Sequence, residues 1–249
     1  MEQRITSRKN ACLQQVKKLL SSRKERQTQG LFVSDGIKLL GEAIRYSSGL
    51  ETVILSDGVQ AEIPEGVRVL RVPGDVMQSI SPMETPQGAL FVCRLPEKTE
   101  FIPRPGMVLL DGIQDPGNLG TILRTADALD IELALLEGCA DPFSHKVVRS
   151  SMGAVFRRPV VQTTWAQAQE ACRRAEIPLG VTALSDRAKD IRRADISRMA
   201  VVIGSEGQGV RKEILASADA ELIIPMNAHC ESLNAAVAAT IVMWQMRVE

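Results

Sequence analysis

The chain has 249 residues, of which 45% are hydrophobic and 24% are charged, and its 30 Lys and Arg balance its 30 Asp and Glu. This length and composition are typical of a soluble globular protein with one large domain or two small ones. They argue against a membrane-spanning chain, because the uncharged, mostly apolar stretch 233–244 is shorter than the roughly 20 residues that a membrane helix needs.

The N-terminus and the cysteines indicate the cellular compartment. Residues 1–10 lack the apolar core of a signal peptide, so we expect a cytoplasmic protein. The five cysteines are scattered, odd in number and never in C-x-x-C spacing, which argues against a disulfide framework and against a zinc cluster. Only His145 and His229 offer imidazole ligands, and they lie far apart in the sequence, so no metal site is expected.

Charge is unevenly distributed along the chain. Residues 1–50 hold ten Lys and Arg against four Asp and Glu, a net charge of +6. The cations gather in and around the first predicted helix: Arg4, Arg8, Lys9, Lys17, Lys18, Arg23, Lys24 and Arg26. Such a cluster can neutralise the phosphates of a nucleic acid and release their counterions, and the plainer alternative is a solvated helix face.

The first hundred residues predict a small α/β module. Apolar residues near helical spacing indicate a helix over residues 8–26. The further predicted elements are a strand at 31–33, a helix at 36–46, strands at 52–55 and 67–72, a short helix at 75–80 and a strand at 89–93. A proline-rich link at 96–105 disfavours helix and central strand, so we predict two domains, residues 1–99 and residues 100–249.

Strands and helices alternate regularly in the second half. The predicted strands are 107–110, 133–136, 160–162, 179–183, 201–203 and 222–224, and the predicted helices are 119–129, 145–152, 165–175, 210–216 and 232–248. This alternation favours a parallel sheet with helices on both faces. The last helix is apolar nearly all round, so we expect it to be buried in the core or against a second subunit.

Three segments of this half stand where a strand passes into a helix. The first motif is DGIQDPGNLGTILRTADAL from Asp111, the second is VVIGSEGQG from Val201, and the third is IIPMNAHCESLNAAVA from Ile223. Ligands of open parallel sheets bind beside such strand ends, where loop amides and helix N-termini are free to contact them. Three such segments in one domain predict a substantial ligand site.

In this order the segments resemble the three motifs of the SpoU family, the RNA ribose 2′-O-methyltransferases of the SPOUT class. The first contains Asn118, Gly120 and Arg124, the second runs from Gly204 to Gly209, and the third runs from Ile224 to Asn234. The stretch 146–153 (KVVRSSMG) also looks like the family. The N-terminal hundred residues resemble, more loosely, the ribosomal-protein-like substrate-binding domain that is often attached to it.

The resemblance implies a parallel-sheet SPOUT domain with a deep trefoil knot, S-adenosylmethionine as cofactor, an RNA substrate and a homodimer. It also implies site residues. The catalytic set is Asn118, Arg124, Glu206, Ser232 and Asn234, and the cofactor-binding set is Gly204, Ile224, Met226 and Leu233. From the charge pattern and the linking segment we add RNA-binding candidates, namely Arg8, Lys9, Lys17, Lys18, Lys146 and Arg149.

Each motif residue also has a plainer structural interpretation. Gly204, with its neighbouring glycines, permits close backbone approach around a nucleoside but also suits a tight turn. Ser232 just before the last helix is expected either to line the site or only to cap free amides. Asn234 needs a partner if it is buried. Arg124 is more plausible as a clamp on phosphate and hydroxyl than as a base, because a guanidinium stays protonated.

The sequence leaves some alternatives open. Ala228 stands where the family usually has Gly, which makes a non-enzymatic RNA-binding protein of the same fold conceivable. A nicotinamide-dependent oxidoreductase is disfavoured, because Glu206 interrupts the G-x-G-x-x-G pattern and the next strand ends without a ribose-binding acid. Ribosomal RNA is favoured over transfer RNA as the substrate because of the additional N-terminal module, and the modified nucleotide is not predicted.

Overall fold

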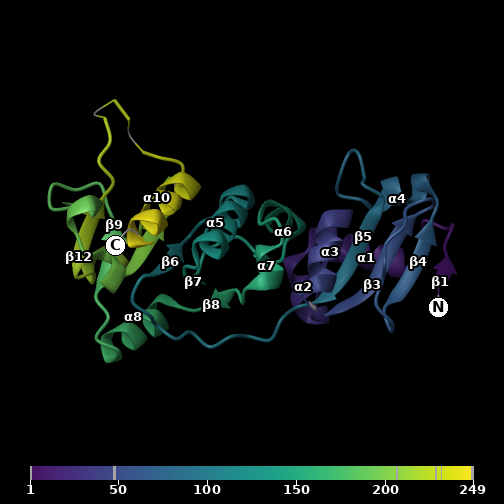
Figure 1. The fold of residues 1–249 in the computed structure, drawn as a ribbon, viewed down its shortest axis with the longest axis horizontal. Coiled ribbons are helices and arrows are strands. Elements are labelled where there is room, and N and C mark those ends of the chain that lie inside the picture. Colours follow the sequence, from purple (N-terminus) through teal and green to yellow (C-terminus); the bar gives the residue numbers. More distant parts are fainter. Residues whose placement is uncertain (1, 47–48, 206, 228, 231, 248–249) are drawn as a thin grey trace. The chain divides into compact units, whose positions relative to one another are not determined.

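A computed structural model describes residues 2–46, 49–205, 207–227, 229–230 and 232–247 (Figure 1). The chain forms two compact units. Unit 1 comprises Met1–Glu97 together with Asp141–Arg157, and unit 2 comprises Lys98–Ala140 together with Arg158–Glu249. The predicted single division near residue 100 therefore misses one feature: the segment Asp141–Arg157 folds with the N-terminal residues.

Unit 1 is a mixed sheet with helices on both faces. Its strands are β1 (Glu2–Arg4), β2 (Leu31–Asp35), β3 (Leu50–Ser56), β4 (Arg68–Val72) and β5 (Ala89–Arg94), in the order β1-β4-β3-β5-β2. Its helices are α1 (Ala11–Ser21), α2 (Arg23–Gln29), α3 (Ile37–Arg45), α4 (Gly74–Ile80), α6 (His145–Ser150) and α7 (Ala154–Arg157). β5 runs antiparallel to both β2 and β3, and the other pairs are parallel.

Alternating side chains of β2 divide unit 1 into two apolar layers. Val33 packs with Leu13 and Val16 of α1 and with residues of α4. Phe32 points to the other face, where its ring centroid lies 5.2 Å from that of Phe143 and 6.1 Å from that of Phe156. The helices α6 and α7, which belong to the late segment, thus cover the face opposite α1.

The helix predicted over residues 8–26 is wrong as one element. Ser22 adopts an extended conformation, with φ −128° and ψ 116°, and separates α1 from α2. Its hydroxyl accepts a hydrogen bond from the Glu25 amide, so Ser22 caps α2. The bend turns Arg26 inwards, where it forms an ion pair with Asp141. Local capping outweighs the continuous helical periodicity here.

Unit 2 confirms the predicted parallel sheet. Its strands are β6 (Met107–Asp111), β7 (Leu133–Leu135), β8 (Val161–Gln162), β9 (Leu179–Thr182), β10 (Lys189–Asp190), β11 (Ala200–Gly204) and β12 (Ala220–Ile223), in the order β10-β12-β9-β11-β6-β7-β8. All pairs are parallel. The helices are α5 (Pro116–Leu129), α8 (Trp165–Arg174), α9 (Lys212–Ala216) and α10 (Ala235–Arg247), with short 3₁₀ turns at Ile191–Arg193 and Ile196–Arg198.

Two helices that carry motif residues begin elsewhere than the sequence predicts. α5 starts at Pro116, capped by Asp115, so Asn118 lies in its first turn instead of in the preceding loop. α10 starts at Ala235 and packs against α5 (Figure 1). α10 buries a small-residue and methionine face but leaves Val237 and Trp244 exposed, at 48% and 60%. No helix in the described part of the chain is long and apolar enough to span a membrane.

Candidate active site

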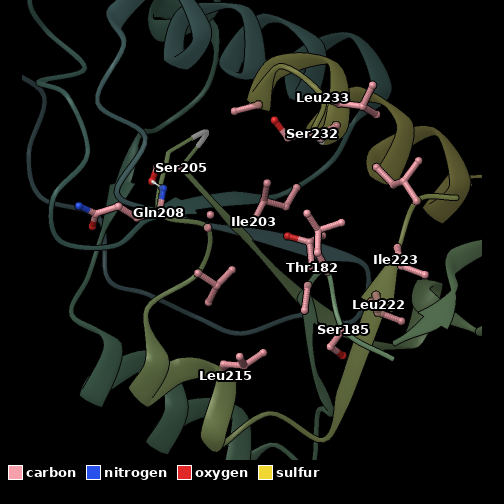
Figure 2. A pocket seen from close by; sticks show the side chains of 18 of the residues that line it. Thr182, Ser185, Ile203, Ser205, Gln208, Leu215, Leu222, Ile223, Ser232 and Leu233 are labelled. Atoms are coloured by element: carbon pink, nitrogen blue, oxygen red, sulfur yellow. Dashed lines mark hydrogen bonds between the residues drawn. The ribbon is translucent and has the colours of Figure 1, made fainter. Parts of the chain in front are cut away.

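The carboxyl ends of three neighbouring strands of unit 2 surround one cavity. Its volume is about 520 Å³, within the range typical of small-molecule sites. Thr182 ends β9, Ile203 and Gly204 end β11, and Ile223 ends β12, and all four line the cavity. Figure 2 shows Thr182, Ile203 and Ser232 around the same space. A site at this edge is what the strand-to-helix segments predict.

The second motif forms a closed loop on one side of this cavity. The amide of Ser205 donates to the carbonyl of Gly209 at 3.2 Å, and the amide of Gly209 donates back to Ser205 at 3.0 Å. Gly209 has φ +65°, a conformation that favours glycine. A Cβ on Gly204 would overlap the backbone of Gly209 and Val210 far inside van der Waals contact. The loop therefore requires glycine at its entrance.

The third motif lines the opposite side. Ile224, Met226, Ser232 and Leu233 all lie in the cavity wall. Gly204, Ile224, Met226 and Leu233, the four predicted cofactor-binding residues, therefore all line one cavity. Ser232 does not cap α10, because that helix begins three residues later. Its position in the cavity wall favours the first of the two expectations stated for it.

A hydrogen bond joins the first motif to the third. Asn234 donates from Nδ2 to Oδ1 of Asn118 at 2.9 Å. The Oδ1 atom of Asn234 accepts from the amides of Ala236 and Val237 at 2.9 and 3.2 Å, so Asn234 is the residue that caps α10. Arg124 lies further along α5 and is exposed. Two of the predicted catalytic residues are therefore in contact, although 116 positions separate them.

Sequence reasoning missed an ionic cluster at the same edge of the sheet. Arg211, at the start of α9, forms ion pairs with Asp111, Glu137 and Glu213. Burial alone would raise the pKa of Glu137, but hydrogen bonds from its own amide, the Trp165 amide and Arg211 lower it below its usual value. Burial opposes the charge of Arg211, whose pKa is nevertheless raised by Asp111 and Glu137. Asp111 is the last residue of β6, and an acidic residue at the end of a predicted strand was the signal from which this cluster could have been found.

Unit 1 carries all six RNA-binding candidates, on two different faces. Arg8, Lys9, Lys17 and Lys18 lie on α1 or just before it, whereas Lys146 and Arg149 lie on α6 across the sheet. Arg8 is paired with Asp75 at 2.7 Å. Arg26 was counted among the basic cluster, but it is only 5% exposed and unavailable to a phosphate.

Two sequence predictions fall outside the described residues. They are the catalytic candidate Glu206 and the departure from the family pattern at Ala228. Within the described residues, no group of three or more His, Cys, Asp or Glu side chains is arranged to hold a metal ion.

Comparisons with known proteins match both halves of the chain. Residues 105–244 match the SpoU rRNA Methylase family, and residues 10–90 match the MRM3-like substrate binding domain. The chain is 32% identical to the 23S rRNA (guanosine(2553)-2′-O)-methyltransferase RlmP of Bacillus subtilis, over 98% of both chains. It is 30% identical to the 23S rRNA (uridine(2479)-2′-O)-methyltransferase of Streptomyces viridochromogenes, over 97% of this chain and 91% of the relative.

Solved structures agree with these relatives. An AdoMet-bound rRNA methyltransferase from Sinorhizobium meliloti superposes with a TM-score of 0.86 at 28% identity, covering 99% of this chain and 97% of that one. The SpoU methyltransferase AviRb from Streptomyces viridochromogenes, in complex with AdoMet, superposes with a TM-score of 0.82 at 27% identity, covering 96% and 98%. The ordered motifs, the parallel sheet and these matches agree, and the chain belongs to the SpoU rRNA methylase family.

Proposed function

We propose that this protein transfers a methyl group from S-adenosylmethionine to a ribose 2′-hydroxyl of ribosomal RNA. The observation that carries the proposal is the cavity in which the second and third motifs meet, together with the Asn234–Asn118 hydrogen bond that joins the first motif to the third. The full-length relatives named as 23S rRNA 2′-O-methyltransferases support the same activity.

The residues of the cavity fit this cofactor. Gly204 permits the loop backbone to approach a ligand closely, and Ile203, Leu222 and Leu233 supply apolar surface for a nucleoside. Thr182 and Ser232 add hydroxyl groups at the wall. When bound, S-adenosylmethionine supplies an electrophilic methyl group on a sulfonium. The cognate cofactor named in two similar structures supports this assignment.

The contribution of the chain is mainly alignment. Well-oriented reactants can lower a barrier by roughly 7–11 kcal/mol, so rigid placement of the ribose accounts for a large share of the rate. Asn118 is held by Asn234 and by the Asp115 cap, which fixes the first turn of α5. Arg124 remains protonated and is suited to clamp a phosphate and orient the hydroxyl. We propose Glu206, of the second motif, as the partner that positions Arg124 or another cation.

Ribosomal RNA is the favoured substrate because both full-length relatives named above act on 23S rRNA. The N-terminal residues 10–90, which match a substrate-binding family, support RNA binding by unit 1. The target ribose is best supplied unpaired or extruded, since an A-form duplex offers its 2′-hydroxyls only along a shallow groove. The alternative of a non-enzymatic RNA-binding protein has no support among the relatives.

We further propose that the protein is a cytoplasmic homodimer with the knotted chain path of its class. The exposed Val237 and Trp244 are seven positions apart, so they lie on one face of α10 and leave an apolar stripe. Burying that stripe against a second copy would remove it from water. Sedimentation of the purified protein tests this, and a Trp244→Glu variant that is monomeric beside a dimeric parent is the expected result.

The activity is tested with radiolabelled S-adenosylmethionine and protein-free 23S rRNA or transfer RNA. We expect label in the 23S rRNA and resistance of the modified linkage to alkaline cleavage, because the 2′-oxygen is blocked. Asn118→Ala and Arg124→Ala are expected to abolish labelling while the melting temperature and cofactor affinity stay near those of the parent. Full activity in either variant would remove that residue from the mechanism, and label only in transfer RNA would overturn the substrate.

A further inference from the structure

One buried acidic residue, Asp111, lies beside both ends of the second-motif loop. Asp111 ends β6, and in the parallel register its Cα partner on β11 is Gly204, the first residue of the loop. Where the loop returns, the backbone amide of Arg211 donates to Oδ2 of Asp111 at 2.8 Å. The Nε atom of Arg211 donates to Oδ1 of the same carboxylate at 2.7 Å. The loop therefore begins at Gly204, which pairs with Asp111 in the sheet, and ends at Arg211, which binds the Asp111 side chain.

The burial of this pair makes the contact costly to break. The Asp111 side chain is only 1% exposed, whereas that of Arg211 is 38% exposed. Removing the cation would leave an uncompensated charge in the interior. The planar guanidinium contacts two carboxylates at once, Asp111 through Nε and Glu137 through Nη2, in a fixed geometry that an ammonium lacks.

The guanidinium of Arg211 also contacts Glu137, which lies two residues beyond the end of β7. Its Nη2 atom donates to Oε2 of Glu137 at 3.0 Å, and the same oxygen accepts from the Trp165 amide at 3.0 Å. Arg211 occupies the N-cap position of α9 but makes no side-chain cap there. Its side chain instead joins the start of α9 to the ends of β6 and β7.

We propose that Arg211 and Asp111 are positioning residues that keep the second-motif loop in its cofactor-binding form before the cofactor arrives. The inference rests on the proposed function, because it assigns the loop to the cofactor. If the loop is in its binding form for only a fraction of the time, the apparent affinity for the cofactor falls in proportion to that fraction. Arg211 therefore acts on cofactor affinity through the loop, without touching the reacting atoms.

The first test needs no cofactor. Amide hydrogen exchange is measured for Ser205 and Gly209, whose mutual hydrogen bonds close the loop, in the parent and in Arg211→Ala. We expect exchange at both amides to be about tenfold faster in the variant, with Val202 in β11 unchanged, because only the loop opens locally. Equal exchange at the loop amides in both proteins overturns the proposal.

The second test is calorimetric titration with S-adenosylmethionine. We expect Arg211→Ala to weaken binding about tenfold, with the turnover at saturating cofactor changed much less. Arg211→Lys keeps the positive charge beside Asp111 but loses the planar guanidinium that contacts both Asp111 and Glu137, so an intermediate affinity for the cofactor is expected. Arg173→Ala removes an exposed arginine of the same unit that pairs with Glu170 on its own helix, and it is the matched control with unchanged affinity.

The outcomes separate this inference from the function on which it rests. If the parent does not bind S-adenosylmethionine, the proposed function fails, and the exchange experiment still decides on the loop. If Arg211→Ala does not fold, Arg211→Lys decides: parental affinity and parental loop exchange in that variant overturn the role. A lower melting temperature with unchanged affinity and exchange shows a purely structural arginine and overturns it as well.

Discussion

A single side chain, Asn234, links helix formation to the candidate active site. Its Oδ1 atom caps α10, and its Nδ2 atom binds Asn118 of the first motif. The sequence shows that an amide at the start of an apolar helix needs partners, and it identifies both asparagines as candidates. The pairing itself depends on α5 and α10 packing together, a long-range contact that no local pattern contains.

The two roles of Asn234 are separable by substitution. Asn234→Asp keeps the oxygen that caps α10 but loses the amide donor to Asn118, so we expect stability near that of the parent and a large loss of methylation. Asn234→Ala loses both roles and is expected to be less stable by about 1 kcal/mol as well. Chemical denaturation and a methylation assay measure the two effects. Parental activity in Asn234→Asp would show that the Asn118 contact is dispensable.

The glycines of the second motif differ in what they permit. A Cβ at Gly204 would overlap the returning backbone, whereas a Cβ at Gly207 would meet nothing within 4 Å. We expect Gly204→Ala to cost about 1–3 kcal/mol of stability, as overpacking does, and to impair S-adenosylmethionine binding. Gly207→Ala is the matched control and is expected to bind as the parent does. Thermal melting and calorimetry decide, and equal behaviour of the two variants would contradict the closed loop.

At the scale of elements, α6 packs over a set of buried polar atoms in unit 1. Ser34 Oγ, Asp35 Oδ1 and His145 Nδ1 are buried and have no hydrogen-bond partner among the described residues. Burial raises the pKa of Asp35, against the attraction of Arg149 and His145. Burial also lowers the pKa of His145, helped by Lys146, Arg26 and Arg149 and opposed by Asp35. The junction of β2 and α6 is therefore sensitive to protonation.

The raised pKa of Asp35 and the lowered pKa of His145 act on stability in opposite directions as the pH falls, and His145 is the contribution that destabilises the folded state in acid. Because its folded pKa lies below the ordinary value of 6.5, the unfolded chain binds more protons as the pH falls below 6.5, and the folded state loses stability. We expect the melting temperature of His145→Gln to fall less than that of the parent between pH 7 and pH 5. His229→Gln, on the third-motif loop, is the control. A parental pH profile in His145→Gln would show that His145 carries no burial penalty.

The elements themselves were largely predictable, and the exceptions have physical causes. All six strands expected in the second half form, because buried parallel strands appear as short apolar runs between turn residues. The edge strands β1 (Glu2–Arg4) and β10 (Lys189–Asp190) are polar and short, so periodicity gives no signal for them. The break at Ser22 and the start of α5 at Pro116 are decided by capping, which a count of apolar positions does not weigh.

On the scale of the whole molecule, chain order and unit composition differ. The segment Asp141–Arg157 lies between strands of unit 2 in the sequence but supplies α6 and α7 to unit 1. Phe143, Val147 and Val148 are buried there, and Asp141 neutralises the buried Arg26. Sequence reasoning placed this segment in the second domain because a domain is expected to be continuous and because the proline-rich link is the clearest break in composition.

The RNA-binding candidates lie on two faces of unit 1, and an experiment can decide which face binds RNA. Replacing Lys146 and Arg149 by Ala is compared with replacing Lys17 and Lys18, an equal loss of charge. The double variant on the face that contacts the RNA backbone is expected to bind RNA more weakly than the parent. The slope of log affinity against log salt concentration should fall by about one unit for each contact removed. Filter binding of rRNA over a range of salt concentrations measures both. Unchanged slopes in both pairs would remove these cations from the RNA interface.

The discontinuous make-up of unit 1 predicts how the chain tolerates division. A fragment 1–97 lacks Asp141, so Arg26 is left buried without its carboxylate, a loss of roughly 3–5 kcal/mol when one partner of a buried pair is removed. It also exposes the Phe32 face that Phe143 and Phe156 cover. We therefore expect fragment 1–97 to melt without cooperativity. Fusing residues 141–157 to it through a flexible Gly/Ser linker is expected to restore a cooperative transition, measured by circular dichroism. The same fusion with Asp141→Asn keeps the apolar cover but not the ion pair, and it should melt at a lower temperature. A fragment 1–97 that unfolds as cooperatively, and at the same temperature, as the fusion would show that the late segment only rests on a unit complete without it.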